Sequence, residues 1–199
     1  MRALIDDRTD FSLSWTLEEA MGRSSHALID DGRVWLVDPV DWPPALERIA
    51  ALGEPAGVLQ LLDRHNRDAR AIAARLDIPH LVGRAPAGAP FAVLPLIQRR
   101  RWRESFVWWA RHRTLVVAEA IGTGPFFGLG RAAGVHPMLR LLPPADLRAY
   151  APDHLLVGHG PPLHEGAATA LATALDRSRS DIPRLLRQLP GMVRVARRS

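Results

Sequence analysis

The sequence predicts a layered α/β protein with one hydrophobic core, and three observations support this. The chain has 199 residues, enough for a single domain, and 47% of them are hydrophobic, an ordinary share for a globular protein. Short apolar runs that fit buried strands alternate along the chain with segments of helical spacing. This alternation is typical of helices packed on β-sheets.

The first predicted elements are a β-hairpin and a helix. The hairpin spans residues 26–39, "HALIDDGRVWLVDP", in which Asp31-Gly32 supplies a two-residue turn between apolar runs. The helix spans residues 41–54, because Asp41 can cap it, two prolines fit its first turn and Gly53 can end it.

The next pair is a buried strand and a second helix. The strand spans residues 57–62, "GVLQLL", and the helix runs from Asp68 to Leu76 with an apolar face. The remaining predicted elements are a short strand at 80–82, two strands within 105–120, short helical pieces after 126, a strand leading into a tight turn over 154–166, a helix at 167–179 and a short amphipathic piece at 182–189.

Charge divides the chain into a near-neutral body and a basic tail. The net charge is +5, and all 26 basic residues are arginine. Residues 177–199 contain seven arginines and one aspartate. We therefore expect a single domain over 1–176 and a basic tail over 177–199 with a short amphipathic helix, which could dock on the body or on a second subunit.

Composition also indicates the cellular compartment and the kinds of partner to expect. There are no cysteines, which excludes disulfides and cysteine–zinc sites and fits a cytoplasmic protein. The N-terminal "MRALIDDRTDFSLSW" does not have the pattern of a signal peptide, and no membrane helix is predicted. Nucleic acid is not an expected partner, because the basic excess is confined to the tail and the arginine–tryptophan stretch at 98–113 fits a solvated strand rim.

Several segments resemble the metallo-β-lactamase-fold superfamily in sequence and order. They are "VWLVDP", "LLDRHNRDA", "TLVVAEAIGTG" and "LLVGHGPPL", and the resemblance covers roughly residues 26–175. It implies an α/β fold of a particular kind, a four-layer αββα sandwich. It also implies an active site along one edge, between the two sheets, where members of the superfamily bind metal ions.

The chain departs from the metal-binding pattern of that superfamily. The resemblance implies Thr-His-x-His-x-Asp-His where residues 63–69 read Asp-Arg-His-Asn-Arg-Asp-Ala. Residues 81–111, where a further histidine ligand is expected, contain no histidine. The correspondences are Arg64, Asn66 and Ala69 at histidine positions, Asp68 at the aspartate, His65 at a variable position, Glu119 at the bridging aspartate and His159 at the final histidine.

The remaining donors restrict what metal chemistry is expected. Arginine cannot bind a metal ion because it stays protonated and has no free lone pair. On this alignment the first metal site has lost its histidines, while Asp68, Glu119 and His159 could still hold one weakly bound zinc or iron ion. The leading expectation is that no cofactor is bound.

An internal cation offers a different interpretation of Arg64. Two like charges about 4 Å apart cost about 4 kcal/mol at an effective dielectric constant of about 20. A guanidinium at Arg64 could replace the metal and pair with Asp68 and Glu119. Structural roles remain open beside this: a helix cap for Asp68, a satisfied polar group for Glu119, and a tight turn for His159.

Two functions from different classes follow. The first is a ligand- or partner-binding protein, not a hydrolase, with a remodelled, metal-free cleft whose partner is an unknown small molecule or protein. The alternative is a mononuclear metal-dependent hydrolase of an ester, thioester or amide-like bond. No catalytic residue is singled out, and His80, His112 and His136 are interpreted as non-ligands. The predicted pocket residues are Arg64, His65, Asn66, Asp68, Glu119 and His159.

Overall fold

The computed structural model describes residues 2–65 and 67–188. The strands are β1 (Ala3–Asp6), β2 (Ser12–Leu17), β3 (Ser24–Asp30), β4 (Arg33–Val37), β5 (Glu54–Gln60), β6 (His80–Val82), β7 (Ala92–Arg99), β8 (Trp102–Trp109), β9 (Thr114–Val117), β10 (Ile121–Gly122), β11 (Gly134–Val135) and β12 (His154–Val157). The helices are α1 (Pro43–Leu52), α2 (Ala69–Leu76), α3 (Pro125–Gly128) and α4 (Ala167–Arg177), with short 3-10 turns at Ala110–His112, Pro137–Leu139 and Ala145–Ala149. Within the described residues, no helix has the length and apolar character needed to span a bilayer.

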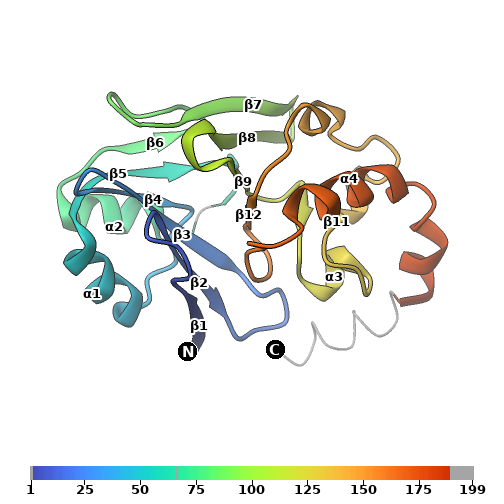
Figure 1. Ribbon diagram of the computed structural model, residues 1–199, viewed down its shortest axis with the longest axis horizontal. Helices are drawn as coiled ribbons and strands as arrows, with labels where there is room; N and C mark the ends of the chain where they lie inside the picture. Colours follow the sequence, from blue (N-terminus) through green and yellow to red (C-terminus); the bar gives the residue numbers. More distant parts are fainter. Residues whose placement is uncertain (1, 66, 189–199) are drawn as a thin grey trace.

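Two β-sheets face each other between two layers of helices (Figure 1). The first sheet has six strands in the order β1-β2-β3-β4-β5-β6, and the second has four in the order β12-β9-β8-β7. Helices α1 and α2 cover the outer face of the first sheet, and α4 lies against the second half of the molecule (Figure 1). This arrangement confirms the predicted four-layer αββα sandwich.

Strand β4 shows how the sequence builds two apolar layers at once. Val34 and Leu36 pack with the helices α1 and α2, whereas Trp35 and Val37 face the core between the two sheets. Both sets are fully buried, as expected for a strand covered on both faces. A continuous apolar run therefore marks the centre of the sandwich.

The predicted hairpin and first two helices are confirmed in the structure. β3 and β4 pair antiparallel around Asp31 and Gly32, both of which have positive φ angles. The residue before α1 is Trp42, which makes no side-chain cap, and Asp41 instead forms an ion pair with Arg75. The predicted cap at Asp41 is therefore wrong, although the helix is in place.

Polar contacts join the two sheets at the edge where β3 approaches β12. His26 in β3 is buried, with Nδ1 2.7 Å from Oγ of Ser14 and Nε2 3.0 Å from the carbonyl oxygen of Val157 in β12. Burial lowers the pKa of His26 to about 4, so the ring is neutral near pH 7. Its Nε2–H donates to the carbonyl, and the hydroxyl of Ser14 donates to Nδ1.

The first part of the predicted tail is packed on the body. Residues 182–188 are helical, with Leu185 buried and Leu186 exposed. Asp181 is also buried and accepts a hydrogen bond from Arg131 at 3.1 Å. The predicted amphipathic positions Ile182, Leu185 and Leu186 thus lie in the described structure, whereas Leu189 and residues 192–199 lie outside it.

Candidate functional site

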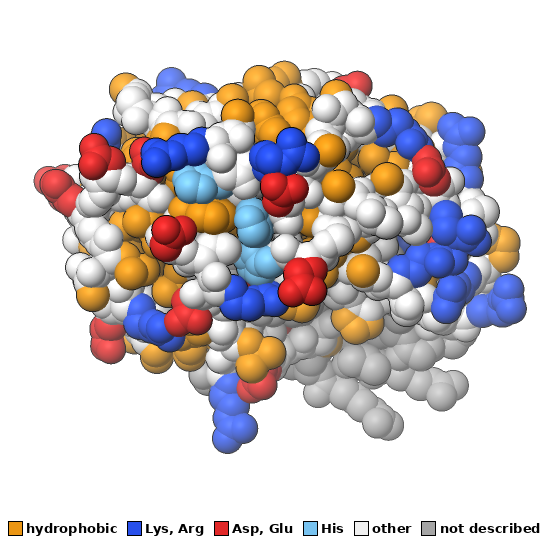
Figure 2. Space-filling model, viewed as in Figure 1, with side chains coloured by type: hydrophobic (Ala, Val, Ile, Leu, Met, Phe, Trp, Pro, Cys, Tyr) orange, Lys and Arg blue, Asp and Glu red, His pale blue; other side chains and the backbone are white. Residues whose placement is uncertain are grey.

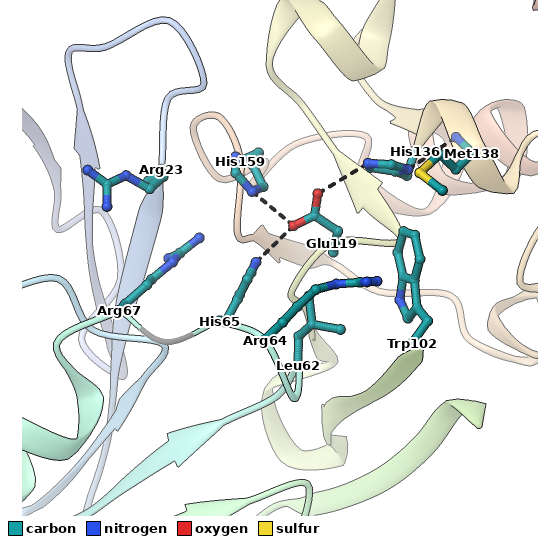
Figure 3. Close-up of a pocket in the computed structure, with 10 residues that line it drawn as sticks. All are labelled: Arg23, Leu62, Arg64, His65, Arg67, Trp102, Glu119, His136, Met138 and His159. Carbon is teal, nitrogen blue, oxygen red and sulfur yellow. Dashed lines mark hydrogen bonds and ion pairs between the residues drawn. The ribbon is translucent and has the colours of Figure 1, made fainter. Parts of the chain in front are cut away.

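The candidate site lies where the carboxyl ends of three strands meet. His65 follows β5, Glu119 follows β9 and His159 follows β12. Strands β9 and β12 are parallel neighbours, so the residues that follow them emerge at the same edge. The three side chains line a pocket of about 510 Å³ (Figure 3). Figure 2 shows the face of the molecule seen in Figure 1, where basic and acidic side chains are interspersed and a few histidine side chains reach the surface.

Three histidines converge on the carboxylate of Glu119 (Figure 3). Oε2 of Glu119 lies 2.8 Å from Nε2 of His65 and 3.1 Å from Nε2 of His159. Oε1 lies 3.3 Å from Nε2 of His136. The Glu119 side chain is 14% exposed, so the cluster is mostly shielded from solvent but open on the pocket side.

The outer nitrogens of His65 and His159 also have partners. Nδ1 of His65 lies 3.3 Å from Oδ2 of Asp38, and Nδ1 of His159 lies 3.0 Å from the carbonyl oxygen of Met21. Both partners are acceptors, so each Nδ1 carries a proton and donates to its partner. Each Nε2 faces Glu119, where it donates a hydrogen bond when the ring is doubly protonated and presents a lone pair when the ring is neutral. A histidine held in this way by a carboxylate or carbonyl is typical of metal ligands.

Asp38 is held rigidly behind His65. Its side chain is buried, its backbone has a positive φ of 44°, and its Oδ1 accepts a hydrogen bond from the N–H of Leu61 at 3.1 Å. A left-handed backbone is uncommon for a residue other than glycine. Asp38 therefore connects the end of β4 to the end of β5 and orients the imidazole of His65.

His136 has a different role from the other two histidines. Its Nδ1 accepts a hydrogen bond from the N–H of Met138 at 3.2 Å, so its Nε2 carries the proton and donates to Oε1 of Glu119. Its ring packs edge-on against Trp102, with centroids 5.0 Å apart. His136 therefore holds one oxygen of Glu119 and leaves the other oxygen to His65 and His159.

The pKa values in the cluster follow from these contacts. Burial alone would raise the pKa of the Glu119 carboxyl, but hydrogen bonds from the three histidines outweigh it and hold the pKa well below its ordinary value. Burial alone would lower the pKa of His65, but the carboxylates of Asp38 and Glu119 outweigh it and raise the pKa. The cluster therefore favours an ionised Glu119 carboxylate next to a protonated His65.

A second glutamate supports the backbone of Glu119. Glu104 in β8 is fully buried, and its Oε1 accepts hydrogen bonds from the N–H groups of Glu119 and Ala120 at 2.8 and 2.9 Å. Its Oε2 accepts one from the indole N–H of Trp102 at 2.8 Å. Burial raises the pKa of Glu104. Glu104 thus fixes the loop that presents Glu119 to the pocket.

Arg67 is the cation that ties the pocket walls together. Its Nη1 donates to the carbonyl oxygens of Ser24 and Asp38, and its Nη2 donates to that of Gly158 at 2.8 Å. These carbonyls belong to the segments of β3, β4 and β12, so one guanidinium connects both sheets. Burial lowers the pKa of Arg67, but arginine remains charged at any physiological pH.

The glycines of the "GHGPP" turn allow close backbone contacts around His159. A Cβ at Gly158 would lie 2.0 Å from the carbonyl oxygen of Ala118. Gly160 has a φ of +99°, and a Cβ there would lie 2.2 Å from the backbone nitrogen of Gly124. Only glycine fits both positions. The turn therefore presents His159 against Glu119 by bringing two loops into direct contact.

The structure brings together four of the six predicted pocket residues. Arg64, His65, Glu119 and His159 line one pocket. Asp68 does not join them, because its Oδ2 accepts a hydrogen bond from the N–H of Asp41 at 2.8 Å, on the side of helices α1 and α2. The predicted Asn66 lies outside the described residues.

The predicted pairing of Arg64 with Asp68 and Glu119 is wrong. The guanidinium of Arg64 lies over the ring of Trp102, 4.4 Å from its centroid, and Nη1 donates to the carbonyl oxygen of Arg101 at 2.6 Å. Its side chain extends along the pocket wall because the chain turns sharply after β5. The residue that turns inward to meet Glu119 is His65, and the partly buried cation is Arg67.

Three residues of the site were not identified from the sequence. His136 was interpreted as a non-ligand, and Asp38 and Arg67 were given no role in the site. A signal for Asp38 was present, since it ends a buried strand at the same edge as the other site residues. His136 gives no such signal, because it comes from an irregular segment between β11 and the next 3-10 turn.

The residues present fit a single metal ion. The ligand atoms of His65, Glu119 and His159 all lie within 4.8 Å of one another, and they form the one group of this kind within residues 2–65 and 67–188. Two histidines and one carboxylate are a donor set of catalytic zinc sites and of non-haem iron sites. Asp68 is replaced by His65 in this set, which changes the predicted ligands.

Comparisons with known proteins find similarity in structure only. No protein-family model and no curated protein sequence matches the chain. A metallo-β-lactamase from Pontibacter korlensis superposes with a TM-score of 0.64 and 10% identity, over 88% of this chain and 99% of that one. A metallo-β-lactamase from Erythrobacter litoralis, with β-mercaptoethanol in its active site, gives 0.62 and 14%, over 90% and 99%.

A protein described as a chemotaxis sensor shares the same architecture. A chemotaxis sensor solved as a peroxy diiron species superposes with a TM-score of 0.57 and 13% identity, over 90% of this chain and 94% of that one. At identities this low the similarity concerns the fold, and function has to be argued from the site itself. The two sheets, their helical layers and these superpositions agree that the chain has the metallo-β-lactamase fold.

Proposed function

We propose that the pocket binds one divalent transition-metal ion and that the chain is a mononuclear metal-dependent hydrolase. One observation carries this proposal. Nε2 of His65 and Nε2 of His159 converge on the same oxygen of Glu119, while their outer nitrogens are held by Asp38 and by the Met21 carbonyl. An ion between these three donors would take the place of the Nε2 protons that otherwise bridge the two histidines and Glu119.

Each residue of the cluster has a distinct part in this proposal. His65, Glu119 and His159 would hold the ion, and His136 positions Glu119 by donating to its other oxygen. A bound ion of this type lowers the pKa of water and polarises a scissile carbonyl. Three protein ligands leave a coordination position open, as catalytic sites require. An ester, thioester or amide-like bond is the expected target.

A metal-free binding cleft is the second candidate, and one feature supports it. Both ring nitrogens of His65 face carboxylates, Asp38 at 3.3 Å and Glu119 at 2.8 Å, so a protonated His65 would neutralise them without an ion. Arg67 adds a second positive charge close by. On this alternative the pocket binds a ligand or a partner and does not hydrolyse it.

Metal analysis of the protein purified without chelator distinguishes the two candidates. We expect one zinc or iron ion per chain, lost in His65→Ala and in His159→Ala. Asp68→Ala is the matched control and keeps the ion, because Asp68 bonds to Asp41 away from the pocket. A metal-free preparation that also fails to gain thermal stability with added zinc would favour the binding cleft, and two ions per chain would contradict both candidates.

A further inference from the structure

Arg64 has uncommitted hydrogen-bond donors at the mouth of the pocket. A guanidinium has five N–H donors in one plane, and the recorded bond of Arg64 within the described residues uses only Nη1, to the carbonyl oxygen of Arg101. Stacking on Trp102 at 4.4 Å fixes the plane of the group. The opposite edge, formed by Nε and Nη2, is therefore oriented and available for a ligand.

The other two arginines of the pocket are committed elsewhere. Arg23 forms two bonds to the carboxylate of Glu19, at 2.6 and 2.9 Å, and Arg67 donates to three backbone carbonyls. No carboxylate among the described residues forms an ion pair with Arg64. Glu119, the acidic side chain that lines the pocket, is already engaged by three histidines. The pocket is thus suited to an anion at Arg64.

The wall next to Arg64 is apolar. Leu62 and Trp102 line the pocket, and Met138 overhangs it with 79% of its surface exposed. A fixed guanidinium beside an apolar wall suits a ligand that has an oxyanion attached to a hydrophobic group, because the planar fork matches a carboxylate or phosphate. Figure 3 shows the guanidinium of Arg64 extending toward the ring of Trp102 beside Glu119.

We propose that the pocket takes an anionic substrate whose carboxylate or phosphate binds the free edge of Arg64 and whose apolar part lies against Trp102 and Met138. The proposal rests on the proposed function, in that the bound molecule is the substrate of the hydrolase. It names the class of substrate, and it makes Arg64 a specificity residue with no part in holding the metal.

Calorimetric titration of the whole protein tests this with three probes of similar shape. Phenylacetate carries a carboxylate, phenyl phosphate carries a phosphate, and phenylacetamide is the neutral counterpart. We expect at least one anionic probe to bind at least tenfold more tightly than the amide, and the stronger one identifies the oxyanion. Equal binding of all three probes, or binding of none, would overturn the proposal.

Variants assign the binding to Arg64. Arg64→Ala should weaken binding of the anionic probe about tenfold, and Arg64→Lys should restore only part of the affinity. Arg70→Ala, at an exposed position of helix α2, should leave the affinity unchanged. Full affinity in Arg64→Lys or in Arg64→Ala would refute the forked contact. Metal content is measured on the same samples, so a protein that holds one ion but ignores the anions would refute this inference and leave the hydrolase proposal standing.

Discussion

Single residues in this pocket differ in how much of the fold depends on them, and Arg67 and Arg64 form the clearest contrast. Arg67 donates to three carbonyls that belong to both sheets, whereas Arg64 lies over Trp102 at the pocket mouth. Buried acceptors that lose their donor cost about 1–3 kcal/mol each when no water replaces it. The two arginines therefore serve different purposes despite being three residues apart.

We expect Arg67→Ala to lower the free energy of unfolding by about 3 kcal/mol, because it leaves carbonyls unpaired at the junction of the sheets. Arg64→Ala is the matched control, with an expected loss of about 0.5 kcal/mol or less, as for an exposed position. Urea denaturation at pH 7 measures both. Losses of equal size in the two variants would contradict the assignment of Arg67 as the cation that joins the two sheets.

At the same scale, the sequence located part of the site. Glu119 and His159 were placed by the resemblance to the metallo-β-lactamase pattern, and the structure brings them together. Arg64 and Asp68 were misplaced because the chain turns between Leu62 and the start of α2, and the direction of each side chain depends on that turn. Spacing along the sequence does not determine which of the six consecutive polar residues at 63–68 faces inward.

At the scale of elements, the turn after β12 carries the positioning of His159. Gly160 and Gly166 both have positive φ angles, +99° and +63°, but a Cβ at Gly160 would meet the backbone of Gly124 at 2.2 Å, while one at Gly166 would meet nothing within 4 Å. A side chain at either position would adopt an unfavourable positive φ angle, but only one at Gly160 would also collide with a neighbouring loop. This makes them a matched pair.

Gly160→Ala should lower the melting temperature far more than Gly166→Ala. For Gly166→Ala we expect a cost of about 1 kcal/mol, from the backbone conformation alone. For Gly160→Ala we expect at least about 3 kcal/mol, because the backbone near Gly124 must move as well. Thermal unfolding followed by circular dichroism checks both, and similar shifts for the two variants would show that the close approach is relieved easily.

The elements differ in how far the sequence predicts them. The hairpin of β3 and β4 was predicted because its turn residues and apolar runs are local signals. Strands β1, β2 and β7 were not predicted. β2 alternates serine and threonine with apolar residues. Its polar side chains are buried and form hydrogen bonds, such as that between Thr16 and Ser24 at 2.8 Å. These hydrogen bonds depend on partners outside β2, which the local sequence of β2 does not reveal.

In the whole molecule, the point where the basic tail begins is not the point where the packed body ends. The basic tail defined by composition begins at residue 177, yet Ser178 is buried and donates to the carbonyl oxygen of Arg140 at 2.9 Å. Asp181 and Leu185 are also buried. The body therefore includes at least the first turns of this segment, and the predicted boundary at 176 does not separate two structural units there.

Two truncations test which part of the tail the fold needs. Removing residues 180–199 should cost about 2–3 kcal/mol, because Leu185 loses an apolar contact worth about 1.5–3 kcal/mol and Arg131 loses its buried partner Asp181. Removing only 192–199 takes away three arginines but none of these contacts, so we expect an unchanged unfolding free energy. Urea denaturation and size-exclusion chromatography measure stability and oligomeric state for both. A gel shift at two salt concentrations tests whether the tail binds nucleic acid instead. Binding that weakens with salt and is lost when residues 192–199 are removed would assign these arginines to a nucleic-acid contact.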